Sequence, residues 1–141
     1  MSAPARTARL VSHLLRGPVL AAACGAALAS PFAYITNQGS NDVSVVDLAG
    51  TPRVVATVAV GAAPAGVVAS SRRGEVFVAN AGGTTVSVID MQSLRVVASL
   101  PSGGGAVGID ASADGRRLFV VDWYGRRLLA YDTEHRELLA S

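Results

Sequence analysis

The chain has 141 residues, half of them apolar, which fits one small domain with a hydrophobic core. Its formal net charge is +2, from twelve basic residues, all arginine, against ten acidic ones. Residues 30–141 carry nine of those arginines and all ten acids, so the basic character belongs to the N-terminus. This distribution argues against a nucleic-acid-binding surface on the rest of the chain.

Residues 1–29 have the features of a secretory signal peptide. Three arginines precede a stretch of small apolar residues, GPVLAAACGAALAS, which ends in the small-x-small sequence Ala27-Leu28-Ala29. We expect cleavage after Ala29, export to the periplasm or beyond the cell, and no membrane span once the segment is removed, because the apolar stretch is short for a bilayer. A disordered N-terminus is the alternative interpretation.

The single cysteine, Cys24, lies inside this segment, so the mature chain is expected to have no disulfide and no thiol chemistry. The sequence AAAC is similar to a lipoprotein cleavage box, but Leu20 stands one place too early for that motif. A lipid anchor at Cys24 is therefore the less favoured interpretation.

A unit of 42–43 residues recurs from Ala33 onward. AYITNQGSNDVSVVDL from Ala33 aligns with VFVANAGGTTVSVIDM from Val76, and LFVVDWYGRRLLAYD from Leu118 supplies a third copy. A period of this length occurs in four-stranded propeller blades and also in helical repeats. The runs are short, alternating and β-branched, and Gly, Asn and Asp separate them, which indicates strands joined by tight turns.

The copies span approximately 33–64, 65–105 and 106–141 within a domain of residues 30–141. The second and third copies each predict four strands, and the first lacks its innermost strand. In chain order the predicted strands are 33–37, 42–47, 53–58, 65–70, 75–80, 85–90, 95–100, 106–111, 117–122, 127–132 and 137–141. Alternation in the third strand of each copy predicts six side chains facing inter-blade cores: Val43, Val45, Val86, Val88, Leu128 and Ala130.

The segments YITNQGSNDVSVVDL, VFVANAGGTTVSVID and GAAPAGVVASSRRGEVFVAN resemble the YVTN-type β-propeller repeat of bacterial exported proteins. The resemblance covers residues 33–141 and implies an all-β fold with about three blades of four antiparallel strands. Closed propellers have 4–8 blades. We therefore expect a partial or truncated propeller, with a ring of several chains as the alternative.

Polar residues recur at the strand ends. Asp47, Asp90 and Asp132 end the third strand of each copy, and we interpret them as acceptors for backbone N–H groups of their own turns rather than as a metal ring. Asn37 and Asn80 end the second strand and are expected to cap their hairpins, with Asp122 as the variant in the third copy.

No constellation predicts catalysis, a cofactor or a metal. His135 is the one histidine after residue 29, and the glycine run Ser102–Gly108 lacks the helix and lysine of a phosphate loop. The most distinctive cluster brackets two aromatic residues with arginines and could bind an acidic or planar partner, although a solvated hairpin is the alternative. Its members are Arg116, Arg117, Trp123, Tyr124, Arg126 and Arg127.

These observations predict an exported module that binds or scaffolds a protein partner or associates with itself, and that is not an enzyme. Propellers similar to this repeat also occur in periplasmic dehydrogenase systems that use quinone cofactors, so a part of such a system is the alternative function. A remnant of a longer gene is a further alternative.

Overall fold

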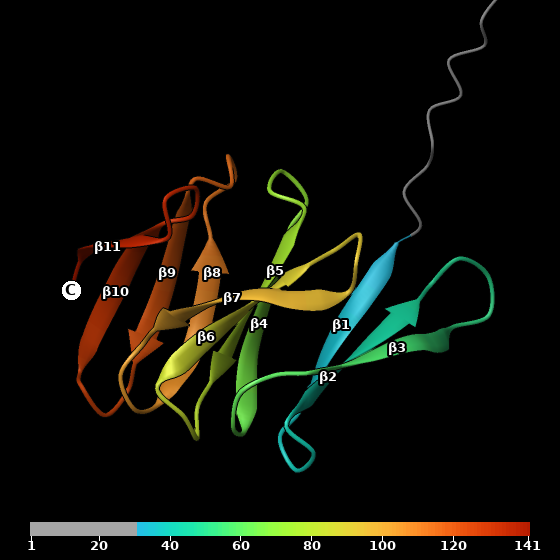
Figure 1. Ribbon diagram of the computed structural model, residues 1–141, viewed down its shortest axis with the longest axis horizontal. Helices are drawn as coiled ribbons and strands as arrows, with labels where there is room; N and C mark the ends of the chain where they lie inside the picture. Colours follow the sequence, from blue (N-terminus) through green and yellow to red (C-terminus); the bar gives the residue numbers. More distant parts are fainter. Residues whose placement is uncertain (1–30) are drawn as a thin grey trace, which may run out of the picture.

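The computed structural model describes residues 31–141, which form eleven strands in three antiparallel sheets and contain no helix (Figure 1). The predicted signal peptide, its cleavage site and Cys24 lie outside the described residues. The first sheet contains β1 (Phe32–Asn37), β2 (Asp42–Asp47) and β3 (Arg53–Ala59). The second contains β4 (Pro64–Ser70), β5 (Glu75–Asn80), β6 (Thr85–Asp90) and β7 (Arg95–Pro101). The third contains β8 (Ala106–Ala111), β9 (Arg117–Asp122), β10 (Arg127–Asp132) and β11 (Glu137–Ala140).

Each sheet is a meander in which consecutive strands pair, in the orders β1-β2-β3, β4-β5-β6-β7 and β8-β9-β10-β11. We refer to these sheets as blades 1, 2 and 3. The predicted all-β arc of about three antiparallel blades is confirmed, and the strand boundaries differ from the predicted ones by one residue at most. As predicted, blade 1 has three strands among the described residues.

Tight turns closed by a left-handed residue occur in all three blades. The last residue of several four-residue turns takes the left-handed conformation, with φ of 59° at Asn41, 53° at Leu94 and 51° at Arg126. Backbone hydrogen bonds close these turns, such as the 2.9 Å bond from the Leu94 N–H to the Asp90 carbonyl. Such a turn fixes the register of the hairpin, which explains why the period is preserved so closely along the chain.

The inner strands of blades 2 and 3 approach closely. A Cβ atom on Gly66 of β4 would lie 2.7 Å from the Val107 carbonyl oxygen of β8. Only glycine allows the two backbones to approach this closely, so Gly66 brings the inner strands together.

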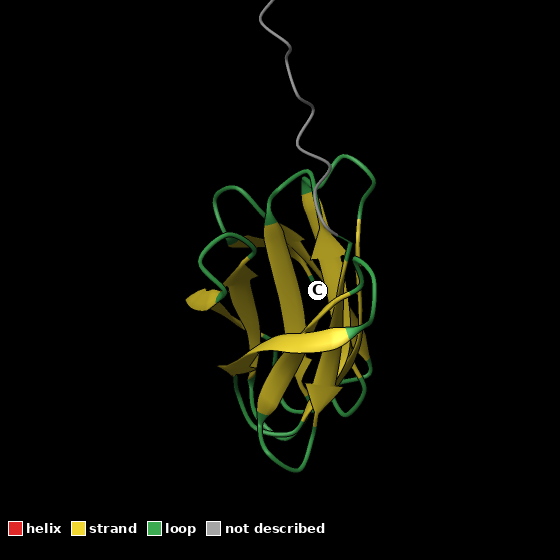
Figure 2. Ribbon diagram, turned by 90° about the vertical axis from the view of Figure 1, so that its right-hand side faces the viewer, coloured by secondary structure: helices red, strands yellow, loops and turns green. Residues whose placement is uncertain are grey.

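The blades pack face to face through two cores, each formed between neighbouring blades (Figures 1 and 2). We call the face that a blade turns toward the following blade its front face, and the opposite one its back face. Between blades 1 and 2, the front-face residues Val43 and Val45 meet the back-face residues Val76, Val78 and Ile89. Between blades 2 and 3, Phe77, Ala79, Val86 and Val88 meet Leu118, Val120, Leu129 and Tyr131.

The core prediction is right for four of its six residues. Val43, Val45, Val86 and Val88 are fully buried. Leu128 is the repeat equivalent of Val86 but is 53% exposed, and Ala130 is only half-buried. Both belong to the front face of blade 3, which has no following blade among residues 31–141. The prediction for Leu128 is therefore wrong, because burial requires a neighbour that the repeat alone does not supply.

Across residues 31–141, no helix of the length and hydrophobicity needed to cross a membrane is present.

Candidate binding surface

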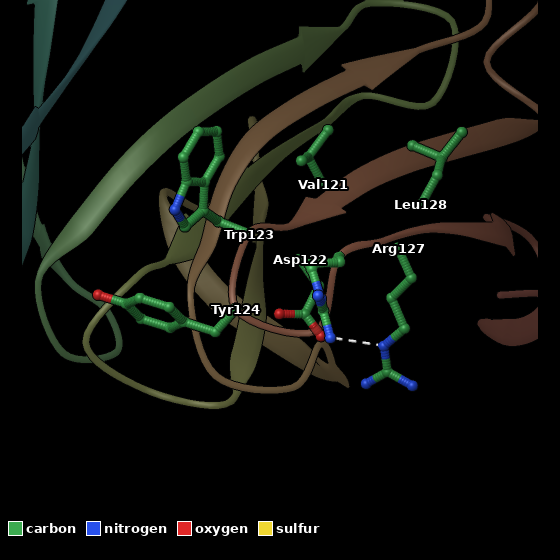
Figure 3. A pocket seen from close by; sticks show the side chains of 7 residues that line it. Val121, Asp122, Trp123, Tyr124, Arg127 and Leu128 are labelled. Carbon is green, nitrogen blue, oxygen red and sulfur yellow. Dashed lines mark hydrogen bonds and ion pairs between the residues drawn. The ribbon is translucent and has the colours of Figure 1, made fainter.

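The turn between β9 and β10, residues 123–126, presents two aromatic side chains at one end of blade 3 (Figure 3). The Trp123 N–H donates to the Gly105 carbonyl at 3.0 Å, which ties the turn to the segment that enters β8. The Arg126 N–H donates to the Trp123 carbonyl at 3.3 Å, and Arg126 takes the left-handed conformation that closes the turn. The backbone of the turn is thus held at both ends.

Asp122 anchors this turn from beneath. Its side chain is only 2% exposed, and it accepts a 2.9 Å bond from the Gly125 N–H. It also accepts a 3.0 Å bond from Arg127 Nε, which Figure 3 shows. The Gly125 N–H, followed by Arg127, holds the pKa of the Asp122 carboxyl below its ordinary value, so this group is charged at neutral pH. Its oxygens are engaged within the turn, which makes Asp122 a structural residue.

Two glycines of the preceding segment make room for these groups. A Cβ on Gly105, whose φ is +92°, would overlap the ring of Tyr124. A Cβ on Gly103, whose φ is +74°, would lie 2.8 Å from Arg127 Nη2 and against the Asp122 carboxylate. The glycine run is therefore a connection between blades 2 and 3, on which the aromatic turn rests.

The aromatic side chains themselves remain accessible. Trp123 is 68% exposed and Tyr124 is 79% exposed. Together with Arg126 they line an open depression of about 730 Å³, whose floor is formed by the front-face residues Val121 and Leu128. A rigid turn that carries exposed aromatic and cationic side chains beside an apolar floor is chemically suited to bind another macromolecule.

The arginines predicted in one cluster separate into two places. Arg126 and Arg127 lie beside the aromatic turn. Arg116 and Arg117 lie at the opposite end of β9, where Arg117 pairs with Asp132 at 3.3 Å. The single six-residue cluster is therefore wrong as drawn, because a six-residue strand separates its two halves.

The recurring aspartates accept hydrogen bonds from their own turns. Asp47 accepts from the Ala49 N–H at 2.9 Å, and Asp90 accepts from the Ser93 N–H at 2.7 Å. Asp132 accepts from the N–H groups of Glu134 and His135 at 2.9 and 2.8 Å. Among the described residues, no group of three or more His, Cys, Asp or Glu side chains is placed to hold a metal ion.

The two asparagines donate hydrogen bonds to polar side chains on the neighbouring strand. Asn80 is fully buried, and its Nδ2 donates to Thr85 Oγ1 and Ser87 Oγ, each at 3.0 Å. Asn37 is half-buried, and its Nδ2 donates to Asp42 Oδ1 at 2.7 Å and to Ser44 Oγ at 2.9 Å. These bonds lock the inner part of each hairpin, so both residues are structural.

Two features of the structure were not predicted from the sequence. Val121 and Leu128 line the depression although the sequence placed Leu128 in a core and gave Val121 no role. Blades 2 and 3 are also joined by Glu75, which is 7% exposed and pairs with Arg136 at 3.1 Å and Arg73 at 3.6 Å. No local spacing indicates a pair 61 residues apart.

The family model described as YNCE-like beta-propeller matches residues 10–139. The chain belongs to this family. No curated protein matches the chain in sequence.

Solved structures of other propeller proteins are similar to this YNCE-like propeller. Hydrazine synthase of Kuenenia stuttgartiensis aligns with a TM-score of 0.72 and 28% identity, over 77% of this chain and 31% of that one. The dihydro-heme d1 dehydrogenase NirN aligns with a TM-score of 0.66 and 23% identity, over 77% and 23%. A functionally unknown protein from Desulfotomaculum acetoxidans aligns with a TM-score of 0.63 and 16% identity, over 78% and 37%. This chain thus spans between 23% and 37% of these proteins, and the two less identical ones support the fold alone.

Proposed function

We propose that this YNCE-like propeller is an exported module that binds or scaffolds another protein and has no catalytic site of its own. The observation that carries the proposal is the rigid turn 123–126, with Trp123 and Tyr124 more than two-thirds exposed beside Arg126. The few residues that supply most of the binding energy in protein interfaces are enriched in Trp, Tyr and Arg. Loops at the ends of a rigid β scaffold are the usual place for recognition.

The non-catalytic part of the proposal is supported by the side chains of residues 31–141. Their one histidine, His135, is exposed, and its Nδ1 lies 3.1 Å from Asp132 Oδ1 in a turn. The buried carboxylate Asp122 is engaged by Gly125 and Arg127, as described above. Among residues 31–141, neither group has a hydroxyl nucleophile as a hydrogen-bond partner, so no acid–base pair with a nucleophile is assembled around them.

The test compares retained proteins on three immobilised forms of the chain. The first is the wild type, the second is Trp123→Ala combined with Tyr124→Ala, and the third is Arg116→Ala as the control at the other end of β9. Proteins from an envelope extract are quantified by mass spectrometry. We expect a protein that binds the wild type and Arg116→Ala equally, and whose binding falls at least about 30-fold on the double variant. Equal retention on all three forms would contradict the proposal.

Export is tested separately. We propose that residues 1–29 are removed and that the protein works in the periplasm or outside the cell. The family match begins at residue 10, so it overlaps the segment that we expect to be removed. The test is therefore to measure which residue is first in the mature chain. Mass spectrometry of the protein from the native cell envelope is expected to find Ser30 first. An intact Met1 or Ser2 in a cytosolic fraction would contradict export.

The second candidate function is a part of a periplasmic redox system that includes a quinone-dependent dehydrogenase. The observation that favours it is the 28% identity to the hydrazine synthase chain, an enzyme by its name. The absorption spectrum of protein purified from its own envelope distinguishes the two candidates. A chromophore that copurifies in stoichiometric amount favours the redox role, and a colourless protein favours the binding module.

A further inference from the structure

The two open ends of the arc carry the two halves of one kind of interface. In each inter-blade core, the front face of one blade meets the back face of the next. Within residues 31–141, no blade packs against the front face of blade 3, and no blade packs against the back face of blade 1. What each face contacts inside the arc therefore predicts what it can contact outside.

The open front face of blade 3 is apolar. On it Phe119 stands opposite Ala130, and Val121 stands opposite Leu128. Phe119, Val121 and Leu128 are 37%, 40% and 53% exposed. Their equivalents in blade 2 are at most 1% exposed, because blade 3 covers them. These equivalents are Phe77, Ala79 and Val86.

The open back face of blade 1 is apolar as well. Ala33 stands opposite Val46 on this face, with Ile35 on the same side of β1. Ile35 is 50% exposed, whereas its equivalent in blade 2, Val78, is fully buried against blade 1. Leu48 is 41% exposed at the edge of this face, whereas its equivalent Met91 packs onto the core.

Exposure of large apolar side chains on the second and third strands of a blade is found at the two ends of the arc and not in blade 2. Val96 and Val97 on β7 are 41% and 47% exposed even though blade 2 has a neighbour on each side. Exposed apolar side chains on an outermost strand therefore do not mark an open end, although Leu100 on the same strand is buried. The exposed residues on β1, β9 and β10 occupy positions that are buried wherever a neighbouring blade is present.

We propose that two copies of the chain associate head to tail, with the front face of blade 3 in one copy packed against the back face of blade 1 in the other. A second copy is the occupant that fits, because the surface complementary to a front face in this fold is a back face, and each chain offers one of each. Two copies that make both contacts form a closed arrangement of six blades, which lies within the range of 4–8 for closed propellers. The association is argued from the inter-blade packing and not from the turn 123–126, but a second copy would cover Val121 and Leu128, which also line the depression beside that turn.

The contact is of the head-to-tail kind, so its two halves are tested independently. Leu128→Asp places a charge in the front half, and Ile35→Asp places one in the back half. Val97→Asp on the outer strand of blade 2 is the matched control. Both test positions are at least half exposed in the single chain, so the variants are expected to fold, which circular dichroism checks. Leu128→Ser and Ile35→Ser replace them if either fails to fold.

The mass of the chain produced from its full sequence is measured by light scattering after size exclusion. We expect two-chain mass for the wild type and Val97→Asp, and one-chain mass for each test variant, with dissociation constants raised at least about 100-fold. An equimolar mixture of the two test variants is expected to recover two-chain mass at a higher concentration, because the undamaged front of one meets the undamaged back of the other.

Three results would overturn the proposal. One is a wild type with one-chain mass at every concentration, which would mean that another occupant covers these faces. Another is sensitivity to Leu128→Asp alone, which indicates contact between two front faces. The third is failure of the mixed variants to associate.

Discussion

Replacing Val88 with aspartate tests the inter-blade core most severely. Val88 is fully buried, stands opposite Phe77 on β5 and Ala98 on β7, and belongs to the core shared with blade 3. Losing the buried valine side chain costs about 1.5–3 kcal/mol. Burying a carboxyl group without a partner costs about 1–3 kcal/mol more. We expect the free energy of unfolding to fall by about 3–5 kcal/mol, a large share of the 5–15 kcal/mol typical of a domain.

The assay is urea denaturation followed by circular dichroism in dilute solution, with Val97→Asp as the matched control on the exposed outer strand. The control is expected to change the free energy of unfolding by no more than about 0.5 kcal/mol. An unchanged midpoint for Val88→Asp would refute the assignment of this face to a core.

The pH dependence of the same variant is a second check. Burial raises the pKa of the introduced carboxyl above its ordinary value of about 3.9. The folded state then binds the proton more tightly than the unfolded state, so the deficit relative to the wild type shrinks as pH falls. A deficit that is constant across pH would show that the new side chain reaches solvent.

Three further predictions concern residues that hold the turns and hairpins. Asn80→Ala removes two hydrogen bonds to hydroxyl groups, one of them fully buried, and is expected to cost about 1–3 kcal/mol in urea denaturation, more than Asn37→Ala at the half-buried equivalent. Gly115→Ala places a Cβ at a φ of +73° and 2.9 Å from Ser70 Oγ, and is expected to lower the free energy of unfolding by more than about 1 kcal/mol. In the control Gly39→Ala the new Cβ meets no atom within 4 Å, so the change is expected to be nearly neutral. Equal thermal midpoints for the two variants would contradict this prediction. Hydrogen bonds to the charged form, first from the Gly125 N–H, lower the pKa of Asp122. The stabilisation from this group is therefore complete above the ordinary pKa of about 3.9 and is lost as pH falls through the lowered pKa. Asp122→Asn is expected to weaken this acid dependence of the free energy of unfolding, and an acid profile identical to that of the wild type would contradict the prediction.

The strands were predictable because each of them carries its own local signal. The alternation in VSVVD and VSVID determines which side chains share a face, and the turn residues between strands fix where each strand ends. Asp90, for example, ends β6 and immediately accepts the Ser93 N–H of its turn. A property that depends on neighbours in sequence can be inferred from the sequence.

Burial at the ends of the arc was not predictable in the same way. Val86 and Leu128 occupy equivalent positions, yet one is fully buried and the other is 53% exposed. The difference arises from a neighbouring blade and not from either residue. The same limit applies to Glu75 and Arg136, which pair across two blades.

The candidate site was predicted in part. The aromatic residues Trp123 and Tyr124 and the adjacent Arg126 and Arg127 do gather at one turn. Arg116 was wrongly grouped with them because closeness in sequence was taken for closeness in space, although β9 runs between them. An extended strand of six residues is about 17–20 Å long, which is enough to separate two surfaces.

Hydrogen–deuterium exchange resolved by peptide tests most directly whether each blade is stabilised by the faces it shares with its neighbours. In dilute solution, where the front face of blade 3 and the back face of blade 1 are free, β5 and β6 have cores on both sides. Their amides are predicted to exchange most slowly, followed by those of β2 and β9, with β3 and β11 fastest. Exchange that is slowest in blade 1 or blade 3, or equal in all three blades, would contradict the packing described here.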